Sequence, residues 1–286
     1  MKIIRAEHLG MCFGVRDAIA LAQEAAAHEP VTVLGQLVHN RTVLDRMRQT
    51  GVEFAERPSE VRTRKAVISA HGASDRAIGR AEAAGLQLVD TTCPLVGFAH
   101  RAVRMLVGEG FHPVVIGKRD HVEVRGLTED LPEVDILLTE EEVERLVERS
   151  RFGVCAQTTQ PINRVRGLVT AIQRRFPRSE VRFVDTVCQP TKQRQQSAVD
   201  LAAQCDVVVV VGGANSNNTR ELVETCRTKC QRVHHVQLPS DLHANWFRED
   251  DVVGLTAGTS TPDDVIQAVE MAMSRVQCKQ EQKEQV

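Results

Sequence analysis

The sequence Val89-Asp90-Thr91-Thr92-Cys93-Pro94 closes an apolar run and opens a helical pattern. It returns almost unchanged as Val184-Asp185-Thr186-Val187-Cys188-Gln189-Pro190. A third cysteine, Cys12, also lies between an apolar run and a helical pattern. Each of the three cysteines therefore stands where a strand is expected to give way to a helix, and this recurrence predicts three repeated units.

Short runs of β-branched residues alternate with amphipathic patterns along the whole chain, which is typical of parallel sheets with crossover helices. Prolines at 94, 161, 190 and 262 suit the first positions of the helices that follow. We expect nine strands, three for each cysteine, at residues 3–5, 31–34, 67–69, 86–89, 114–116, 153–156, 181–184, 207–211 and 253–256. The predicted fold class is α/β, with three small domains of mostly parallel sheet.

The cysteines also suggest where these domains begin and end. We expect the first domain at residues 13–92, the second at 93–187, and the third at 188–278 together with 1–12. A period of roughly 90 residues is longer than that of solenoid repeats, which favours separate domains over an array. Residues 279–286 are polar and are predicted to form a frayed tail.

Composition narrows the class of protein. The longest purely apolar stretch, residues 207–211, is far shorter than a membrane helix requires, and the N-terminus lacks a secretory pattern. A net charge of −2 with both signs interspersed gives no reason to expect nucleic acid as a partner. We therefore expect a cytoplasmic protein, in which eight cysteines serve as metal ligands or buried thiols rather than disulfides.

A second regularity follows each cysteine at a nearly constant interval. His39 lies 27 residues after Cys12, and His121 and Ser216 each lie 28 residues after their own cysteines. Ligands of parallel sheets bind beyond the carboxyl ends of the strands, where helix N-termini point. We therefore expect these polar junctions to face one pocket. Further junction residues are expected at the ends of other strands, namely His71, Thr158 and Ser260.

Three cysteines in register and no fourth predict an iron–sulfur cluster with one iron open for catalysis, because clusters that only transfer electrons take four thiolates. The alternative is that each cysteine is a small buried thiol, which is common for a single cysteine but disfavoured for three in register. The remaining cysteines are interpreted as buried thiols. Cys226 and Cys230 lie four residues apart on one helical face, so a zinc pair remains an alternative there.

The other junction residues offer imidazole, amide and hydroxyl donors, which together with helix N-termini suit a phosphate or diphosphate. Each of them taken singly is equally well interpreted as a helix cap. Glu123 is the one carboxylate beside them, and a bound anion would raise its pKa and make it a proton donor. The alternative is a solvated loop acid. The donors are His39, Asn40, His71, His121, Ser216, Asn218 and Ser260.

Several ordered motifs spread over nearly the whole chain are Cys12-Phe13-Gly14-Val15, Val38-His39-Asn40, Ser69-Ala70-His71-Gly72, Asp90-Thr91-Thr92-Cys93-Pro94-Leu95-Val96, Gln157-Thr158-Thr159, Asn215-Ser216-Asn217-Asn218 and Thr256-Ala257-Gly258. Together they resemble the LytB/IspH family of 4-hydroxy-3-methylbut-2-enyl diphosphate reductases. The resemblance implies three α/β domains in a pseudo-threefold cloverleaf around a 4Fe-4S cluster held by Cys12, Cys93 and Cys188. It also implies the last step of the non-mevalonate isoprenoid pathway, with ferredoxin or flavodoxin as electron donor.

The resemblance further implies a role for each junction residue. The substrate loses its allylic hydroxyl as water and becomes isopentenyl or dimethylallyl diphosphate. Glu123 would deliver protons, and Thr158 would help to position the substrate hydroxyl. The diphosphate would be held by His39, His71, His121, Ser216, Asn218 and Ser260, with Asn40 and Asn217 beside them.

Two departures from the family pattern stand out. Val122 replaces a usual proline, which could loosen the loop that aims Glu123. Asn217 replaces the second of two usual serines, which could alter the grip on the diphosphate.

Two other functions remain open for a cluster held by three cysteines. One is a dehydratase similar to quinolinate synthase. The other is a redox or iron sensor whose cluster is read by a partner protein, in which case the polar junction residues would be dispensable.

Overall fold

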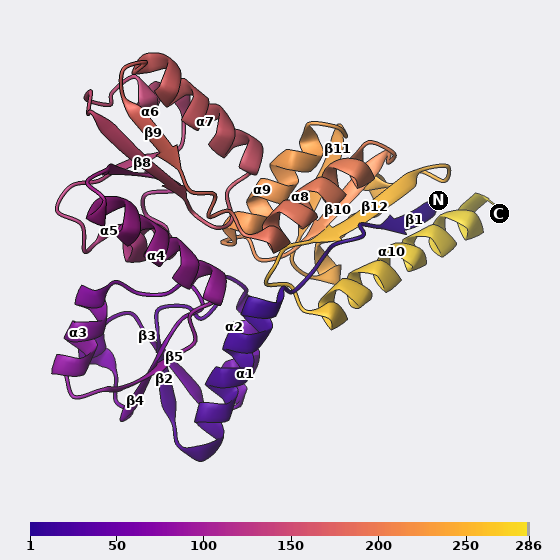
Figure 1. Cartoon of the computed structure of the whole chain (residues 1–286). Coiled ribbons are helices and arrows are strands. Elements are labelled where there is room, and N and C mark those ends of the chain that lie inside the picture. Colours follow the sequence, from indigo (N-terminus) through magenta and orange to yellow (C-terminus); the bar gives the residue numbers. More distant parts are fainter. Residues whose placement is uncertain (285–286) are drawn as a thin grey trace. The chain divides into compact units, whose positions relative to one another are not determined.

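Figure 1 shows the computed structural model of the chain, which describes the backbone of residues 1–284 and the side chains of residues 1–276. Within these residues, twelve strands form three four-stranded sheets, and every pair of neighbouring strands is parallel. The predicted α/β class with three parallel sheets is confirmed.

The first sheet has the strand order β3-β2-β4-β5. Its strands are β2 (Val31–Leu34), β3 (Val52–Ala55), β4 (Lys65–Ile68) and β5 (Gln87–Asp90). The helical segments of this part of the chain are α1 (Phe13–His28), α2 (Arg41–Gln49), the short η1 (Pro58–Glu60) and α3 (Asp75–Ala83).

The second sheet has the order β7-β6-β8-β9. Its strands are β6 (His112–Ile116), β7 (Asp135–Leu137), β8 (Arg151–Ala156) and β9 (Glu180–Phe183). The helices are α4 (Pro94–Gly108), α5 (Val122–Thr128), α6 (Glu140–Val143) and α7 (Ile162–Arg175).

The third sheet has the order β1-β12-β10-β11. Its strands are β1 (Lys2–Arg5), β10 (Val207–Val211), β11 (Arg232–Val236) and β12 (Val252–Ala257). The helical segments are α8 (Gln189–Ala202), α9 (Asn217–Arg227), η2 (Pro239–Asp241), η3 (Ala244–Trp246) and α10 (Asp263–Glu284).

All three sheets repeat one topology. In the first two, the second strand along the chain lies at one edge and is followed in space by the first, third and fourth strands. The third sheet follows the same rule, except that its fourth strand is β1, the N-terminal strand, which pairs with β12. Each cysteine of the predicted cluster therefore follows the fourth strand of one sheet.

The prediction of nine strands was wrong because it missed one strand in each sheet. The missed strands β3, β7 and β11 occupy the same outer position, paired on one side only. An edge strand does not need two apolar faces, and β11, for example, contains Arg232, His234 and His235. The apolar runs that reveal a central strand are therefore weak in all three.

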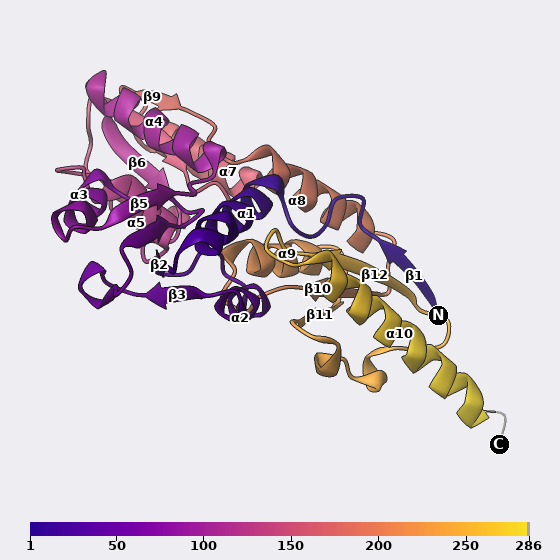
Figure 2. The ribbon, with the colours of Figure 1, turned by 90° about the horizontal axis from the view of Figure 1, so that it is seen from below.

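The core of the third sheet is built on β10, whose five valines are completely buried. Val207, Val209 and Val211 pack with residues of α10, whereas Val208 and Val210 pack with residues of α8 and α9. Figure 2 shows the three helices around this sheet, with β1 running beside α10. Burial on both faces explains why this strand is an uninterrupted apolar run. Burying each valine side chain contributes about 1.5–3 kcal/mol to the stability of the sheet.

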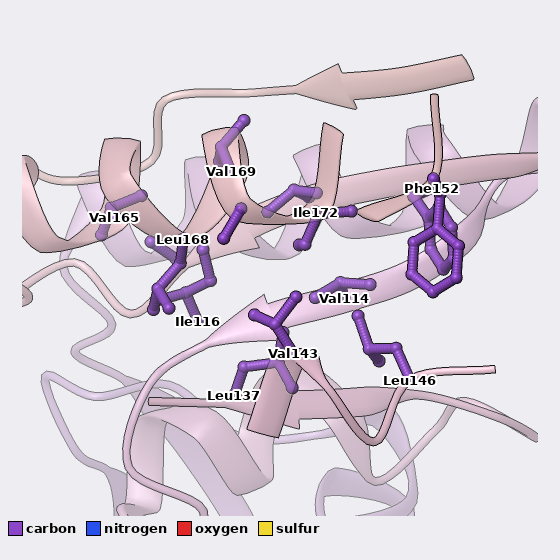
Figure 3. Packing of buried hydrophobic residues seen from close by; sticks show 14 of the residues in the cluster. Val114, Ile116, Leu137, Val143, Leu146, Phe152, Val165, Leu168, Val169 and Ile172 are labelled. Atoms are coloured by element: carbon purple, nitrogen blue, oxygen red, sulfur yellow. The ribbon is translucent and has the colours of Figure 1, made fainter. Parts of the chain in front are cut away.

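The second sheet is covered on both faces in the same way. Figure 3 shows Val114, Ile116 and Phe152 packed against Val165 and Ile172 of α7. On the opposite face, Val115 and Cys155 pack with residues of α4 and α5. Because α5 is anchored in this core, the residues at its start have a fixed position.

The described residues divide into two compact units. One contains Gly14–Val38 and Leu44–Cys188 and holds the first two sheets. The other contains Met1–Phe13, His39–Val43 and the chain from Gln189 onward, and it holds the third sheet. The predicted tail continues α10 as far as Glu284, and residues 285 and 286 lie outside the described residues. Among the described helices, none combines the length and apolarity needed to span a membrane.

Candidate active site

The three cysteines are anchored by the same backbone contact. In each sheet the cysteine N–H donates to the carbonyl oxygen of the second residue after the third strand of that sheet. The three hydrogen bonds join Cys12 to Thr259 (3.1 Å), Cys93 to Ala70 (3.1 Å) and Cys188 to Thr158 (3.0 Å). The register that the sequence predicted therefore has a structural basis, because topologically equivalent loops present the cysteines.

A second contact fixes each cysteine loop two residues earlier. The Thr91 hydroxyl donates to the carbonyl oxygen of Ile68 (2.5 Å), and the Thr186 hydroxyl donates to that of Ala156 (2.6 Å). Gly10 takes this place before Cys12, with a φ of +74° that favours glycine. Its N–H still donates to the carbonyl oxygen of Ala257 (3.1 Å). The threonine in the repeated Asp-Thr motif is thus a structural anchor.

The cysteine side chains suit an inorganic cluster. All three are partly exposed, unlike the buried Cys155 and Cys226. Gly14 lies against Cys93, and a methyl group there would come within 2.4 Å of the sulfur. The glycine therefore keeps space free beside this thiol, as a bulky group held by Cys93 would require.

Glu123 lies at the centre of a buried network in the second sheet. Its carboxylate accepts a hydrogen bond from the Thr158 N–H (2.6 Å), and its own N–H donates to Nδ1 of His121 (3.2 Å). Thr158 in turn accepts from Cys188 through its carbonyl oxygen (3.0 Å). The expected proton donor, the residue expected to orient the substrate and one expected cluster ligand are thus linked by direct contacts.

Glu123 is only 1% exposed, and this burial raises the pKa of its carboxyl to about 7. Hydrogen bonds from Thr158 act in the opposite direction and favour the ionised form. Burial is thus a cause of the raised pKa in addition to the bound anion that the sequence suggested. A carboxyl with a pKa near neutrality is well matched to proton donation.

His71 lies in the β4–α3 loop of the same compact unit. The loop turns at Gly72, whose φ of +72° favours glycine, and the Gly72 N–H donates to the carbonyl oxygen of Ser69 (3.0 Å). The rings of His71 and His121 meet edge to face with centroids 5.6 Å apart. Two imidazoles from different sheets therefore lie close enough to contact one diphosphate group.

Asn218 carries the clearest unsatisfied donor of the other unit. Its side-chain oxygen accepts a hydrogen bond from the Thr259 N–H (2.9 Å). Thr259 is also the residue whose carbonyl oxygen accepts from the Cys12 N–H. The Asn218 Nδ2 is buried and has no hydrogen-bond partner among the described residues. A buried N–H without a partner is costly, so this atom indicates a missing acceptor such as a diphosphate oxygen.

The neighbours of Asn218 are mostly held in place as helix caps. The Ser216 hydroxyl caps α9 by accepting from the Thr219 N–H (3.3 Å), and Asn217 is the buried first residue of that helix. In the same way, the Asn40 side chain accepts from the Val43 N–H (3.3 Å) at the start of α2. The capping interpretation of Ser216 and Asn40 is therefore confirmed, although capping does not prevent a hydroxyl or amide from also contacting a ligand.

His39 is tied into the third sheet's unit by its backbone. Its carbonyl oxygen accepts from the Ser260 hydroxyl (3.4 Å), and a methyl group at Gly213 would approach the same oxygen to 2.4 Å. Burial, with a contribution from the nearby Arg220, lowers the pKa of His39. A lowered pKa favours the neutral imidazole of His39.

The predicted site residues thus fall into two groups, one in each compact unit. Sequence reasoning missed Gly14 and Thr259, because one acts by lacking a side chain and the other through its backbone. The unit of the first two sheets holds Cys93, Cys188, His71, His121, Glu123 and Thr158. The unit of the third sheet holds Cys12, His39, Asn40, Ser216, Asn217, Asn218 and Ser260.

Val122 does not leave Glu123 loosely held. Val122 is the first residue of α5, and His121 caps that helix with its side chain. Together with the Thr158 contact, these interactions aim the carboxyl without the proline that the family pattern usually has at this place.

The remaining described cysteines have the character of core thiols. Burial raises the pKa of Cys155 and of Cys226 to about 12 and that of Cys205 to about 11. The Cys226 thiol donates to the carbonyl oxygen of Ala198 (3.9 Å), and that of Cys230 to the carbonyl oxygen of Asp206 (3.4 Å). The burial of both side chains and these hydrogen bonds favour the core interpretation over a zinc pair.

Comparisons with known proteins show which family the chain resembles. The family model described as LytB protein matches residues 3–274. A protein of Trichlorobacter lovleyi named 4-hydroxy-3-methylbut-2-enyl diphosphate reductase is 36% identical over 278 residues, which cover 96% of this chain and 99% of the relative. A Geobacter protein of the same name is 39% identical over 272 residues, 94% of this chain and 95% of the relative.

Two solved structures are also similar to this chain. The E-1-hydroxy-2-methyl-but-2-enyl-4-diphosphate reductase of Plasmodium falciparum superposes with a TM-score of 0.87 at 27% identity, covering 93% of this chain and 86% of that one. A structure described as (E)-4-hydroxy-3-methyl-but-2-enyl diphosphate reductase, the terminal enzyme of the non-mevalonate pathway, gives a TM-score of 0.69 at 33% identity, covering 96% and 99%. The chain belongs to the LytB protein family.

Proposed function

We propose that the chain reductively removes the allylic hydroxyl group of 4-hydroxy-3-methylbut-2-enyl diphosphate, with Glu123 as the residue that delivers the proton. Family membership and relatives of this name over almost the full length make the chain an oxidoreductase of the non-mevalonate isoprenoid pathway. The reaction consumes two electrons and two protons and releases water with isopentenyl or dimethylallyl diphosphate.

The buried pair of Glu123 and Thr158 carries the mechanistic part of this proposal. A hydroxyl leaves readily only as water, so the site needs a protonated group near neutral pH. With a pKa of about 7, Glu123 is protonated in roughly half of the molecules at pH 7. Thr158 contacts the Glu123 carboxylate directly and is placed to hold the substrate hydroxyl beside it.

The polar junction residues supply the hydrogen-bond donors that bind the diphosphate. His71 and His121 provide two neighbouring imidazoles, and Asn218 provides a buried amide N–H without a partner. Directional donors of this kind match phosphate oxygens without requiring a cluster of lysines or arginines. The remaining donors are His39, Asn40, Ser216, Asn217 and Ser260.

We further propose that Cys12, Cys93 and Cys188 hold one 4Fe-4S cluster. The partial exposure of the three cysteines, their equivalent backbone anchors and the space kept by Gly14 support this assignment. When bound, the cluster supplies low-potential electrons and one iron without a protein ligand at which a substrate hydroxyl is activated. A ferredoxin or flavodoxin is the proposed electron donor.

The division into domains at residues 13–92, 93–187 and 188–278 with 1–12 remains part of the proposal. It is supported by the three sheets of identical topology. Cytoplasmic localisation is also proposed, because Cys155, Cys205, Cys226 and Cys230 form no disulfide among the described residues.

The test is turnover by anaerobically prepared protein with a full complement of iron and sulfide. Incubation with the hydroxymethylbutenyl diphosphate and a low-potential reductant is expected to yield both prenyl diphosphates, measured by mass spectrometry. Iminoaspartate with dihydroxyacetone phosphate, the substrates of the quinolinate-synthase alternative, is expected to remain unchanged. Failure to consume the allylic diphosphate would refute the proposed function.

Mössbauer spectroscopy tests the ligand set separately. Addition of the substrate diphosphate is expected to change the signal of one iron site and leave the other sites unchanged. A uniform spectrum in both states would contradict a cluster with one open iron.

A further inference from the structure

Glu129 and Asp130, just beyond the end of α5, reach from the second sheet to the start of α3 beside the first sheet. The Asp130 carboxylate accepts from the backbone N–H groups of Asp75 (2.7 Å) and Arg76 (3.0 Å). The Glu129 carboxylate accepts from the Ser74 hydroxyl and from Arg80 (2.8 Å). The Glu129 carbonyl oxygen also accepts from the Arg76 side chain (3.1 Å).

These contacts act on the N-terminus of α3. Ser74 caps the helix by accepting from the Ala77 N–H (3.0 Å), and its hydroxyl hydrogen goes to Glu129. Asp130 takes two further N–H groups of the first turn, which have no partner within the helix. A carboxylate is also favoured there by the helix dipole. Residues of the second sheet's domain thus complete the cap of a helix that belongs to the first.

The β4–α3 loop and the start of α5, the two segments that these contacts join, also carry the two imidazoles of the candidate site. His71 lies three residues before Ser74 in the β4–α3 loop, and α5 begins directly after His121. Between them, a methyl group at Gly126 would lie 3.7 Å from the carbonyl carbon of Ala73, so the loop touches α5. His100 of α4 lies against both Gly72 and Gly126 and limits how closely the two segments approach.

On the remaining side the two segments stand apart. There they border a cavity of about 510 Å³. Its walls include Ser69, Ser74 and Arg80 from the first sheet's part of the chain, and Val122, Arg125 and Glu129 from the second. The polar contacts of Glu129 and Asp130 therefore act together with His100 and the loop's own hydrogen bond at Gly72 to set the position of the loop.

We propose that Glu129 and Asp130 are positioning residues that hold His71 at the distance from His121 that diphosphate binding requires. This inference rests on the proposed role of the two histidines. The backbone contacts of Asp130 and the buried Ser74 contact carry most of the effect. The Arg80–Glu129 ion pair contributes less, because both side chains are partly exposed.

The test is the double variant Glu129→Ala/Asp130→Ala in the cluster-loaded protein. Its KM for the allylic diphosphate is expected to rise about tenfold, while kcat at saturating substrate stays within about twofold. Affinity for inorganic diphosphate, measured by calorimetry, is expected to fall by a similar factor. The variant Glu129→Gln/Asp130→Asn keeps oxygen acceptors and is expected to recover most of the affinity.

Glu133→Gln is the matched control, because it removes an exposed carboxylate that pairs with Arg149 in the same part of the chain. If the alanine double variant does not fold or does not load its cluster, the double variant Ser74→Ala/Arg80→Met removes the side-chain partners of Glu129 instead. Its KM is expected to rise at least threefold. A KM and an inorganic diphosphate affinity within twofold of the parent would overturn the inference, and so would a loss confined to kcat.

Variants His71→Ala and His121→Ala separate this inference from the function on which it rests. If both bind inorganic diphosphate as tightly as the parent, the proposed diphosphate site is wrong. If both lose affinity and the Glu129/Asp130 variants do not, only the positioning role is wrong.

Discussion

Replacing Glu123 by glutamine removes the proposed proton donor and little else. The amide has nearly the same shape and its oxygen still accepts from the Thr158 N–H, so the contact at 2.6 Å is preserved. General acid catalysis typically contributes a factor of 10² to 10⁴, so kcat is expected to fall by roughly 100- to 10,000-fold. Affinity for inorganic diphosphate is expected to stay within about threefold, because Glu123 is not among the proposed diphosphate ligands.

The pH dependence of kcat provides a second test of this prediction. With a pKa of about 7, the donor is protonated in about 90% of molecules at pH 6 and about 10% at pH 8. Parent kcat is therefore expected to fall as pH rises through 7, and this dependence is expected to vanish in Glu123→Gln. Single-turnover assays under anaerobic conditions with excess reductant measure both quantities.

Stability provides an independent readout of the same pKa. The folded pKa of about 7 exceeds the ordinary value of 4.5, so the native state binds more protons than the unfolded state between these values. The stability of the parent therefore decreases as pH rises through this window, and glutamine avoids that loss. The stability advantage of Glu123→Gln is expected to grow from about 1 kcal/mol at pH 5 to about 3 kcal/mol at pH 8, measured by anaerobic denaturant unfolding.

Two results would refute the reasoning. One is a kcat of Glu123→Gln within threefold of the parent at pH 7 with a full cluster. The other is a stability difference that does not change with pH, since that would mean that the buried carboxyl has an ordinary pKa. Glu133→Gln, at an exposed position, is the control for both measurements.

Three further predictions test other parts of the site. Substituting Cys12, Cys93 or Cys188 by serine is expected to lower the content of bound iron and sulfide severely. The control variant Cys205→Ser is expected to retain both. Full iron content in any of the first three variants would show that its cysteine is not a cluster ligand. Asn218→Ala is expected to weaken inorganic diphosphate binding by about 10- to 100-fold, because a buried donor to a charged group is lost. Asn245→Ala, on an exposed turn, is its control, and equal affinities in the two variants would argue against contact with the ligand. Gly14→Ala places a methyl group 2.4 Å from the Cys93 sulfur and is expected to reduce cluster occupancy, whereas Gly79→Ala has open space around it and leaves iron content unchanged.

Much of the site could be predicted from sequence because its residues follow strands at fixed intervals. His39, His121 and Ser216 each lie five residues beyond the first strand of a sheet, which explains their nearly constant distance from the cysteines. The residues that act through shape or backbone left no comparable signal. Gly14 and Thr259 are examples, and so are Glu129 and Asp130, whose partners lie 49 to 55 residues away along the chain.

The α/β class, the three cysteines in register and the polar ends of the strands could be predicted from the chain alone, because apolar periodicity and strand-to-helix junctions are local properties of a sequence. The position of the edge strands, the pairing that lets β1 complete the third sheet and the burial that raises the pKa of Glu123 became visible only in the folded chain. Those outcomes depend on which distant segments pack together. Thr158 contacts Glu123 across 35 residues, and no local pattern specifies such a meeting.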